Sequence, residues 1–142
     1  MHRRARILVV DADRGKCELL RYLLEGQGYD VEQAQSSTEA LLKVGQTPFH
    51  LVLAAIDMPG TNGLEMLRRI KEANRNTAVL VMANRGHLEH TIEAIRYSAS
   101  DYLANPSENP DDVLAAVEKE LSDHGAPFSP WLDGVLAPAP AV

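Results

Sequence analysis

Several features that define other protein classes are scarce in this sequence. It has one cysteine, Cys17, so no internal disulfide can form. No apolar run approaches the roughly 18 residues that a membrane-spanning helix needs, and the opening "MHRRAR" is not followed by the apolar core of a signal peptide. Acidic residues outnumber basic ones by 20 to 14, which argues against broad binding to nucleic acid. These absences predict a protein of the reducing cytoplasm, with neither membrane nor nucleic acid as a partner.

Two kinds of functional motif are also missing. The sequence has no glycine-rich phosphate-binding loop. Its five histidines show no metal-ligand spacing with cysteine or acidic residues, apart from "HLEH" at 87–90, which we interpret as two solvated histidines. Cys17 lies in a helical pattern and is predicted to be a small core residue, because free cysteines are usually buried.

What the sequence does contain is a regular alternation of short apolar runs and longer amphipathic ones. The 142 residues, of which 45% are hydrophobic, suit one domain. Strands are predicted at 6–10, 29–34, 50–55, 77–83 and 101–104, and helices at 14–28, 36–45, 63–74, 87–100 and 109–121. Strands this apolar are typical of a sheet covered on both faces. The pattern therefore predicts an α/β fold, a (βα)5 doubly wound parallel sheet with helices on both faces.

Local signals mark where several of these helices begin and end. Asp13 is a candidate N-cap for the first helix, and Ser36 with Glu39 forms a capping box for the second. The first helix is predicted to stop at Gly26 or Gly28 and the second at Gly45. Asn109 and Pro110 are the expected cap and first residue of the last helix. The inward faces are predicted to carry Cys17, Leu20 and Leu24; Leu64, Leu67 and Ile70; Leu88, Ile92, Ile95 and Ala99; and Leu114, Val117 and Leu121.

The character of the sequence changes after the last predicted helix. Residues 124–142 hold four of the eight prolines and the only tryptophan. We predict a globular domain over 1–123, followed by a Pro/Ala-rich tail or linker over 124–142. As an alternative, a short helix at 130–136 docks on the domain or on a partner through Phe128, Trp131 and Leu132.

In a doubly wound fold, ligands bind beyond the carboxyl ends of the strands. The segments that follow the predicted strands are "DADR" (11–14), "AAIDMPG" (54–60), "MANR" (82–85) and "ANPS" (104–107). Any site is therefore expected among these four segments.

Over residues 5–122 the chain resembles the receiver domain of two-component response regulators. The resemblance rests on "ILVVDAD", "GYDVEQAQSSTEAL", "LVLAAIDMPGTNGLEMLRRIK" and "DYLANP", in order and with suitable spacing. It implies a flavodoxin-like sheet with strand order 2-1-3-4-5 and a role in phosphorelay signal transduction. It also implies a site in which two acids hold Mg²⁺, an aspartate accepts the phosphoryl group, and a hydroxyl and a lysine bind its oxygens.

Carried onto this sequence, that site has lost most of its chemistry. Of the acidic pair, Asp11 is kept and Ala12 replaces its partner. The acceptor position, four residues before the proline of "MPG", holds Ala55. Met82 stands at the hydroxyl position and Asn105 at the lysine position. A methyl group cannot form an acyl phosphate, so the sequence predicts no phosphotransfer and no enzymatic activity.

Two other acidic residues offer alternatives to this prediction. Asp57 lies two residues past the vacated acceptor and is expected in a surface turn, but it is also the candidate for a relocated acceptor. Asp13 is the second such candidate, beside its expected role as a helix cap. A weak cation site formed by Asp11, Asp13 and Asp57 is a further alternative, although Mg²⁺ binding is expected to be weak or absent and no cofactor is predicted.

We therefore predict a pseudo-receiver, an atypical receiver domain that signals by phosphorylation-independent protein–protein interaction. The resemblance implies a binding surface formed by 87–100, 101–104 and 109–121, which includes the aromatic switch position Tyr102. Its partners would be a histidine kinase, an output domain or a second copy of the chain. The alternatives are a receiver that still transfers phosphate through Asp57 or Asp13, and the regulatory N-terminal fragment of a larger response regulator whose output domain is missing.

Overall fold

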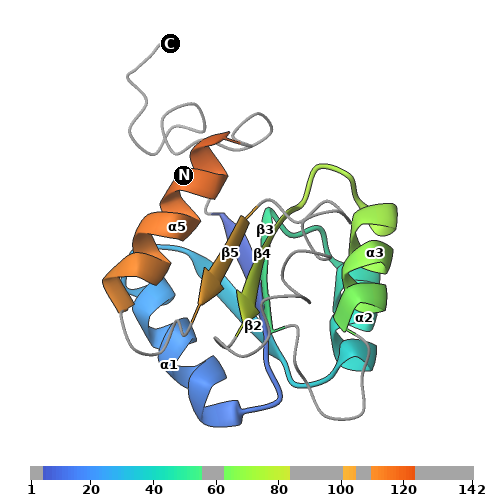
Figure 1. Ribbon diagram of the computed structural model, residues 1–142, viewed down its shortest axis with the longest axis horizontal. Coiled ribbons are helices and arrows are strands. Elements are labelled where there is room, and N and C mark those ends of the chain that lie inside the picture. Colours follow the sequence, from blue (N-terminus) through green and yellow to red (C-terminus); the bar gives the residue numbers. More distant parts are fainter. Residues whose placement is uncertain (1–4, 56–62, 84–100, 105–109, 124–142) are drawn as a thin grey trace.

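The computed structural model of the 142-residue protein describes residues 5–55, 63–83, 101–104 and 110–123 (Figure 1). It contains a parallel sheet of five strands in the order β2-β1-β3-β4-β5. The strands are β1 (Arg6–Val10), β2 (Asp30–Ala34), β3 (Leu51–Ala55), β4 (Ala78–Ala83) and β5 (Asp101–Ala104). Both the fold class and the strand order agree with the prediction.

The described helices cover the two faces of this sheet in pairs. They are α1 (Arg14–Glu25), α2 (Ser37–Gln46), α3 (Gly63–Ala73) and α5 (Pro110–Asp123). Helices α1 and α5 pack together on one side, and α2 and α3 pack together on the other (Figure 1). No helix of the described ranges is long and apolar enough to cross a lipid bilayer. The helix predicted at 87–100, the tail at 124–142 and the short helix at 130–136 lie outside the described residues.

The sheet is buried because its central strands are apolar on both sides. Every residue of β3 is buried, as are the last four residues of β1. Only strands sandwiched between helices lack the alternation of polar and apolar side chains, so this pattern places β1 and β3 in the middle of the sheet. The more polar β2 lies at its edge.

The ends of α1 and α2 follow the local signals closely. At the start of α2, the Ser36 hydroxyl accepts from the Glu39 N–H at 3.1 Å, and the Glu39 carboxylate accepts from the Gln35 N–H at 2.9 Å. The capping box is thus formed, with its return bond one residue earlier than usual. After α1, Gly28 has a φ of 95°, a left-handed conformation that glycine adopts without strain. The turn at Gly28 directs the chain into β2.

The described inward faces match the predicted ones except for a shift in α5 and the additional burial of Met66 in α3, while the side chain of Leu64 and residues 88–99 lie outside the described part of the chain. In α1 the buried residues are Cys17, Leu20 and Leu24, and in α3 both Leu67 and Ile70 are buried. In α5, Val113, Val117 and Leu121 are buried, whereas Leu114 is only partly so. The buried stripe of α5 therefore begins one residue earlier than predicted.

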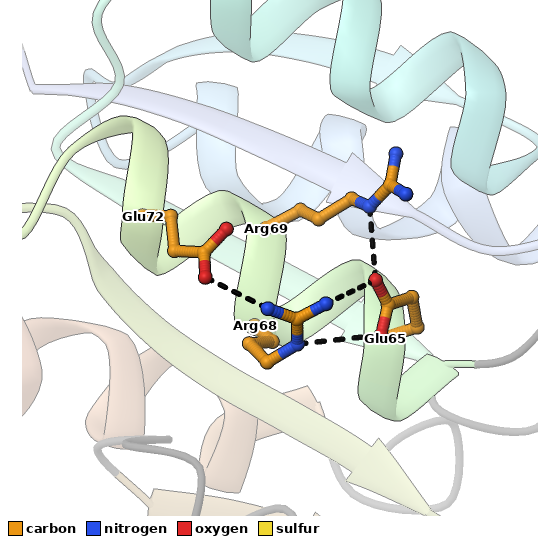
Figure 2. Close-up of polar contacts among 4 residues, drawn as sticks. All are labelled: Glu65, Arg68, Arg69 and Glu72. Carbon is orange, nitrogen blue, oxygen red and sulfur yellow. Dashed lines mark hydrogen bonds and ion pairs between the residues drawn. The ribbon is translucent and has the colours of Figure 1, made fainter.

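The outer face of α3 carries a compact network of charges. Glu65 accepts hydrogen bonds from Arg68 and Arg69, and Arg68 also donates to Glu72 at 2.8 Å (Figure 2). The hydrogen bonds from Arg68 and Arg69 hold the pKa of Glu65 below its ordinary value. All four side chains are exposed to solvent, where such pairs add little to stability. We interpret this network as a solvated surface.

Candidate functional site

The candidate site lies where the parallel strands end at one edge of the sheet. In the register of the sheet Val10 pairs with Ala54, and Ala55 pairs with Met82. Asp11 directly follows Val10, so it comes level with Ala55 on the neighbouring strand. Three of the predicted positions, Asp11, Ala55 and Met82, are therefore brought together at adjacent strand ends.

Two of these three positions are apolar and buried. Ala55 is 8% exposed and Met82 is 3% exposed. Because they are in register on parallel strands, their side chains leave the sheet on the same side. A methyl group offers no nucleophile, and a thioether has no proton to donate to a phosphoryl oxygen. At these two positions, β3 and β4 supply apolar packing surface.

Asp11 is the one carboxylate among these three positions, and its contacts are local. Its side chain is largely buried and accepts a hydrogen bond from the Asp13 N–H at 2.9 Å. Its own N–H donates to the Ala34 carbonyl at 3.1 Å, which ties the end of β1 to the end of β2. These bonds give Asp11 a role in shaping the β1–α1 turn.

Asp13 is the N-cap of α1, as the sequence predicted. One oxygen of its carboxylate accepts from the Gly15 N–H at 2.9 Å and from the Lys16 N–H at 3.2 Å. The same oxygen therefore satisfies two of the N–H groups that a helix start leaves without partners. Between Asp11 and Asp13, Ala12 is exposed and contributes only a methyl group.

A buried thiol lies directly behind this turn. The Cys17 Sγ donates to the Asp11 carbonyl at 3.3 Å, and the residue is completely buried. Burial, reinforced by the negative charge of Asp11, raises the pKa of the thiol to about 11, although the hydrogen bond to the Asp11 backbone works against this shift. Only a thiolate is a strong nucleophile or metal ligand, so Cys17 is inert near neutral pH. Its burial was predicted correctly, but its contact with Asp11 was not foreseen.

The described residues do not fit the Mg²⁺ ion that the chemistry of a receiver requires. A hard cation needs several oxygen ligands, usually including more than one carboxylate when the protein supplies the charge. Within the described ranges, no three His, Cys, Asp or Glu side chains lie close enough together to hold a metal ion. Of the proposed set Asp11, Asp13 and Asp57, the second uses one oxygen to cap α1, and the third lies outside the described residues.

The remaining predicted positions are only partly visible. Strand β5 pairs with β4 so that Tyr102 lies opposite Val81, but only the backbone of Tyr102 is described. Asn105 lies outside the described residues, although it directly follows Ala104, the last residue of β5. The roles assigned to Tyr102, Asn105 and Asp57 therefore stay predictions.

Known proteins are similar to this chain in both sequence and structure. A family model described as "Response regulator receiver domain" matches residues 7–118. The transcriptional regulatory protein ZraR of Escherichia coli is 39% identical over 116 residues, which are 82% of this chain and 26% of ZraR. A CpxR homolog of Haemophilus influenzae is 33% identical over 123 residues, 87% of this chain and 53% of that protein. This chain thus spans about a quarter of the first of these relatives and about half of the second.

Solved structures of receiver proteins are also similar to this chain in fold. A CheY-like receiver domain protein of Methanospirillum hungatei superimposes with a TM-score of 0.82 at 27% identity, covering 87% of this chain and 98% of that one. NtrX of Brucella abortus superimposes with a TM-score of 0.82 at 26% identity, covering 87% of this chain and 28% of NtrX. The fold described above is therefore shared with a protein of about this length and with a segment of a much longer one.

Proposed function

Because this chain belongs to the response regulator receiver family, we propose that it is an atypical receiver that acts through protein–protein contacts and not by phosphoryl transfer. The observation that carries the proposal is the side chain at the end of β3. Ala55 lies in register with Met82 and level with Asp11, at the position that the family resemblance assigns to the phosphoryl acceptor. Neither Ala55 nor Met82 can form or stabilise an acyl phosphate.

The proposal is also supported by how few carboxylates lie at the described strand ends. A cluster of carboxylates repels itself and needs a cation to relieve the repulsion. Here Ala12 and Ala55 remove two acids, and Asp13 is engaged with the N–H groups at the start of α1. The β1–α1 turn is therefore held by hydrogen bonds within the chain, and this domain rests in one conformation without an ion.

Signalling by such a domain depends on which surface its partner recognises. We place that surface on the segment 87–100 together with β5 and α5, as the family resemblance implies. A histidine kinase, an output domain and a second copy of this chain are the candidate partners. Because the chain spans about a quarter of ZraR, the regulatory part of a longer response regulator is a compatible version of the same function.

The proposal can be tested by adding Mg²⁺ and beryllofluoride, a phosphoryl analogue, while following amide NMR shifts. We expect no saturable response at Asp11 or in the segment that contains Asp57. The matched control carries Ala12→Asp, Ala55→Asp, Met82→Thr and Asn105→Lys, which restore the residues of a working receiver, and it should respond.

A saturable response in the unmodified chain, centred on Asp11 and Asp57, would overturn the proposal. So would a mass increase of one phosphoryl group after incubation with a small acyl phosphate. Loss of that increase in Asp57→Asn or in Asp13→Asn would identify the relocated acceptor.

A further inference from the structure

Helix α1 exposes an apolar strip on the side opposite its buried face. Leu19 is 42% exposed and Tyr22 is 76% exposed, and residues three apart lie on the same face of a helix. Within the described residues, the other large hydrophobic side chain exposed to this degree is Leu42, at 60%. Leu42 belongs to α2, on the far side of the sheet (Figure 1). The strip formed by Leu19 and Tyr22 is therefore a local feature of α1.

Two ion pairs lie along one border of this strip. Arg14 binds Glu18 at 3.3 Å and Arg21 binds Glu25 at 3.0 Å, each pair one turn apart along α1. Positive and negative charges are thus matched along that border. An occupant of the strip would need apolar side chains and would need no strong charge of its own.

Helix α5 packs beside α1 on the same face of the sheet (Figure 1). Both helices follow strands of a parallel sheet and return along the same face of it, so they run in the same direction. They also contact one another, as Figure 1 shows. Tyr22 is one turn before the end of α1, and Asp123 is the last residue of α5. The two helices therefore end at the same side of the domain.

The sequence that follows Asp123 contains apolar side chains that could cover the strip. Residues 124–142 include Phe128, Leu132 and Trp131, the only tryptophan of the chain. Trp131 is eight residues beyond Asp123, and an extended chain of that length reaches about 26 Å. Because packed helices lie only about 8–10 Å apart, this distance is ample to return from the end of α5 to Tyr22 on α1.

We propose that the segment 128–136 docks on the α1 strip of the same molecule, with Trp131 against Leu19 and Tyr22. The small size of the strip favours this occupant over a second copy. A stable complex between separate proteins buries about 800 Å² on each partner, far more than two side chains provide. A tethered segment has an effective concentration in the millimolar range and binds to a smaller surface.

The docked segment would cover the outer face of the second half of α1, away from the β1–α1 turn that forms the candidate site. It would compete with any partner that binds the outer face of this helix. This contact is independent of whether the domain accepts phosphate.

Because Trp131 is the only tryptophan, its fluorescence reports on this contact alone. With selective excitation in the full chain, we expect a blue-shifted emission and protection from acrylamide. The double variant Leu19→Ser, Tyr22→Ser should shift the emission to the red and increase quenching. Leu42→Ser is the matched control, an exposed leucine on the other face, and it should change neither signal. Both variants alter exposed positions, so their thermal unfolding should stay close to that of the parent.

Two results would overturn the proposal. The first is an emission spectrum that is the same in the parent and in the Leu19→Ser, Tyr22→Ser variant. The second is a blue shift that disappears on dilution, which would show that the segment binds another copy of the chain.

Discussion

At the scale of single residues, Cys17 and Asp11 show how buried polar groups at the end of the sheet find hydrogen-bond partners. The thiol donates to the Asp11 carbonyl, and the Asp11 carboxylate accepts from the backbone of Asp13. Burial and the nearby carboxylate keep the thiol protonated, because its pKa is raised to about 11. The sulfur acts here as a small apolar group with one weak hydrogen bond.

This raised pKa predicts a loss of stability in alkali. In the unfolded chain the thiol ionises near pH 9.0, whereas in the folded protein it stays protonated until about pH 11. Between these values the unfolded state binds fewer protons, so the free energy of unfolding falls as the pH rises. The full loss is at most about 2–3 kcal/mol. Urea denaturation between pH 8 and pH 11 measures it.

The control for this prediction is Cys17→Ala, which has no thiol to ionise. It should be less stable than the parent at pH 8, because it leaves a small cavity. Its stability should nevertheless decline less steeply with pH, since other groups that titrate in this range are common to both proteins. Equal slopes would contradict the assignment.

At the scale of elements, α1 depends on Asp13 for its start. Asp13→Ala should lower the free energy of unfolding by about 0.5–2 kcal/mol, because two N–H groups lose their acceptor. Asp13→Asn keeps a side-chain oxygen at the cap and should retain most of the stability. Chemical denaturation of the two variants compares them directly. Equal destabilisation by both would mean that the negative charge of Asp13, and not its capping oxygen, is what matters.

The helix caps were predictable because they depend on short stretches of sequence. Asp13 stands just before an amphipathic run, and Ser36 precedes Glu39 by three residues. In both places the side chain and the N–H groups that it satisfies are near neighbours along the chain. Such signals are visible without knowing the rest of the fold.

Other boundaries depend on packing between distant segments and were less predictable. Helix α2 continues through Gly45 to Gln46, although glycine often ends a helix. The buried stripe of α5 begins at Val113 and not at Leu114, because its contacts with α1 and the sheet set the rotation of the helix. The meeting of Cys17 with Asp11 likewise needs the path of the turn between β1 and α1.

The residues that meet at the end of the sheet could be predicted from the order of strands along the chain. Strand ends at the carboxyl edge follow from a parallel sheet, and the register places Ala55 beside Met82. The role assigned to Ala55 came from the family resemblance, since no pattern of polarity marks this residue as the acceptor position.

At the scale of the whole molecule, few carboxylates lie at the described strand ends, so we predict that Mg²⁺ does not change the stability of the protein. A ligand stabilises a protein only if it binds the folded state better than the unfolded one. With Asp11 as the one acid of its pair and a methyl group at Ala55, the thermal midpoint should be the same in millimolar Mg²⁺ and in EDTA. Calorimetry at constant ionic strength measures this difference.

A variant with Ala12→Asp and Ala55→Asp supplies the comparison. Three carboxylates would then face one another, so the protein should be less stable in EDTA and should regain stability when Mg²⁺ is added. A clear rise in the midpoint of the unmodified chain with Mg²⁺ would instead reveal a cation site that uses acids elsewhere.

The burial of Ala55 and Met82 also determines which substitutions the protein tolerates at these positions. A carboxylate placed alone at Ala55, or a hydroxyl alone at Met82, would be enclosed without a partner, and an unpartnered polar group in an apolar setting is destabilising. A polar substitution at either position is therefore unfavourable until the other has been made. A working phosphoryl site at this end of the sheet would therefore need several substitutions made together.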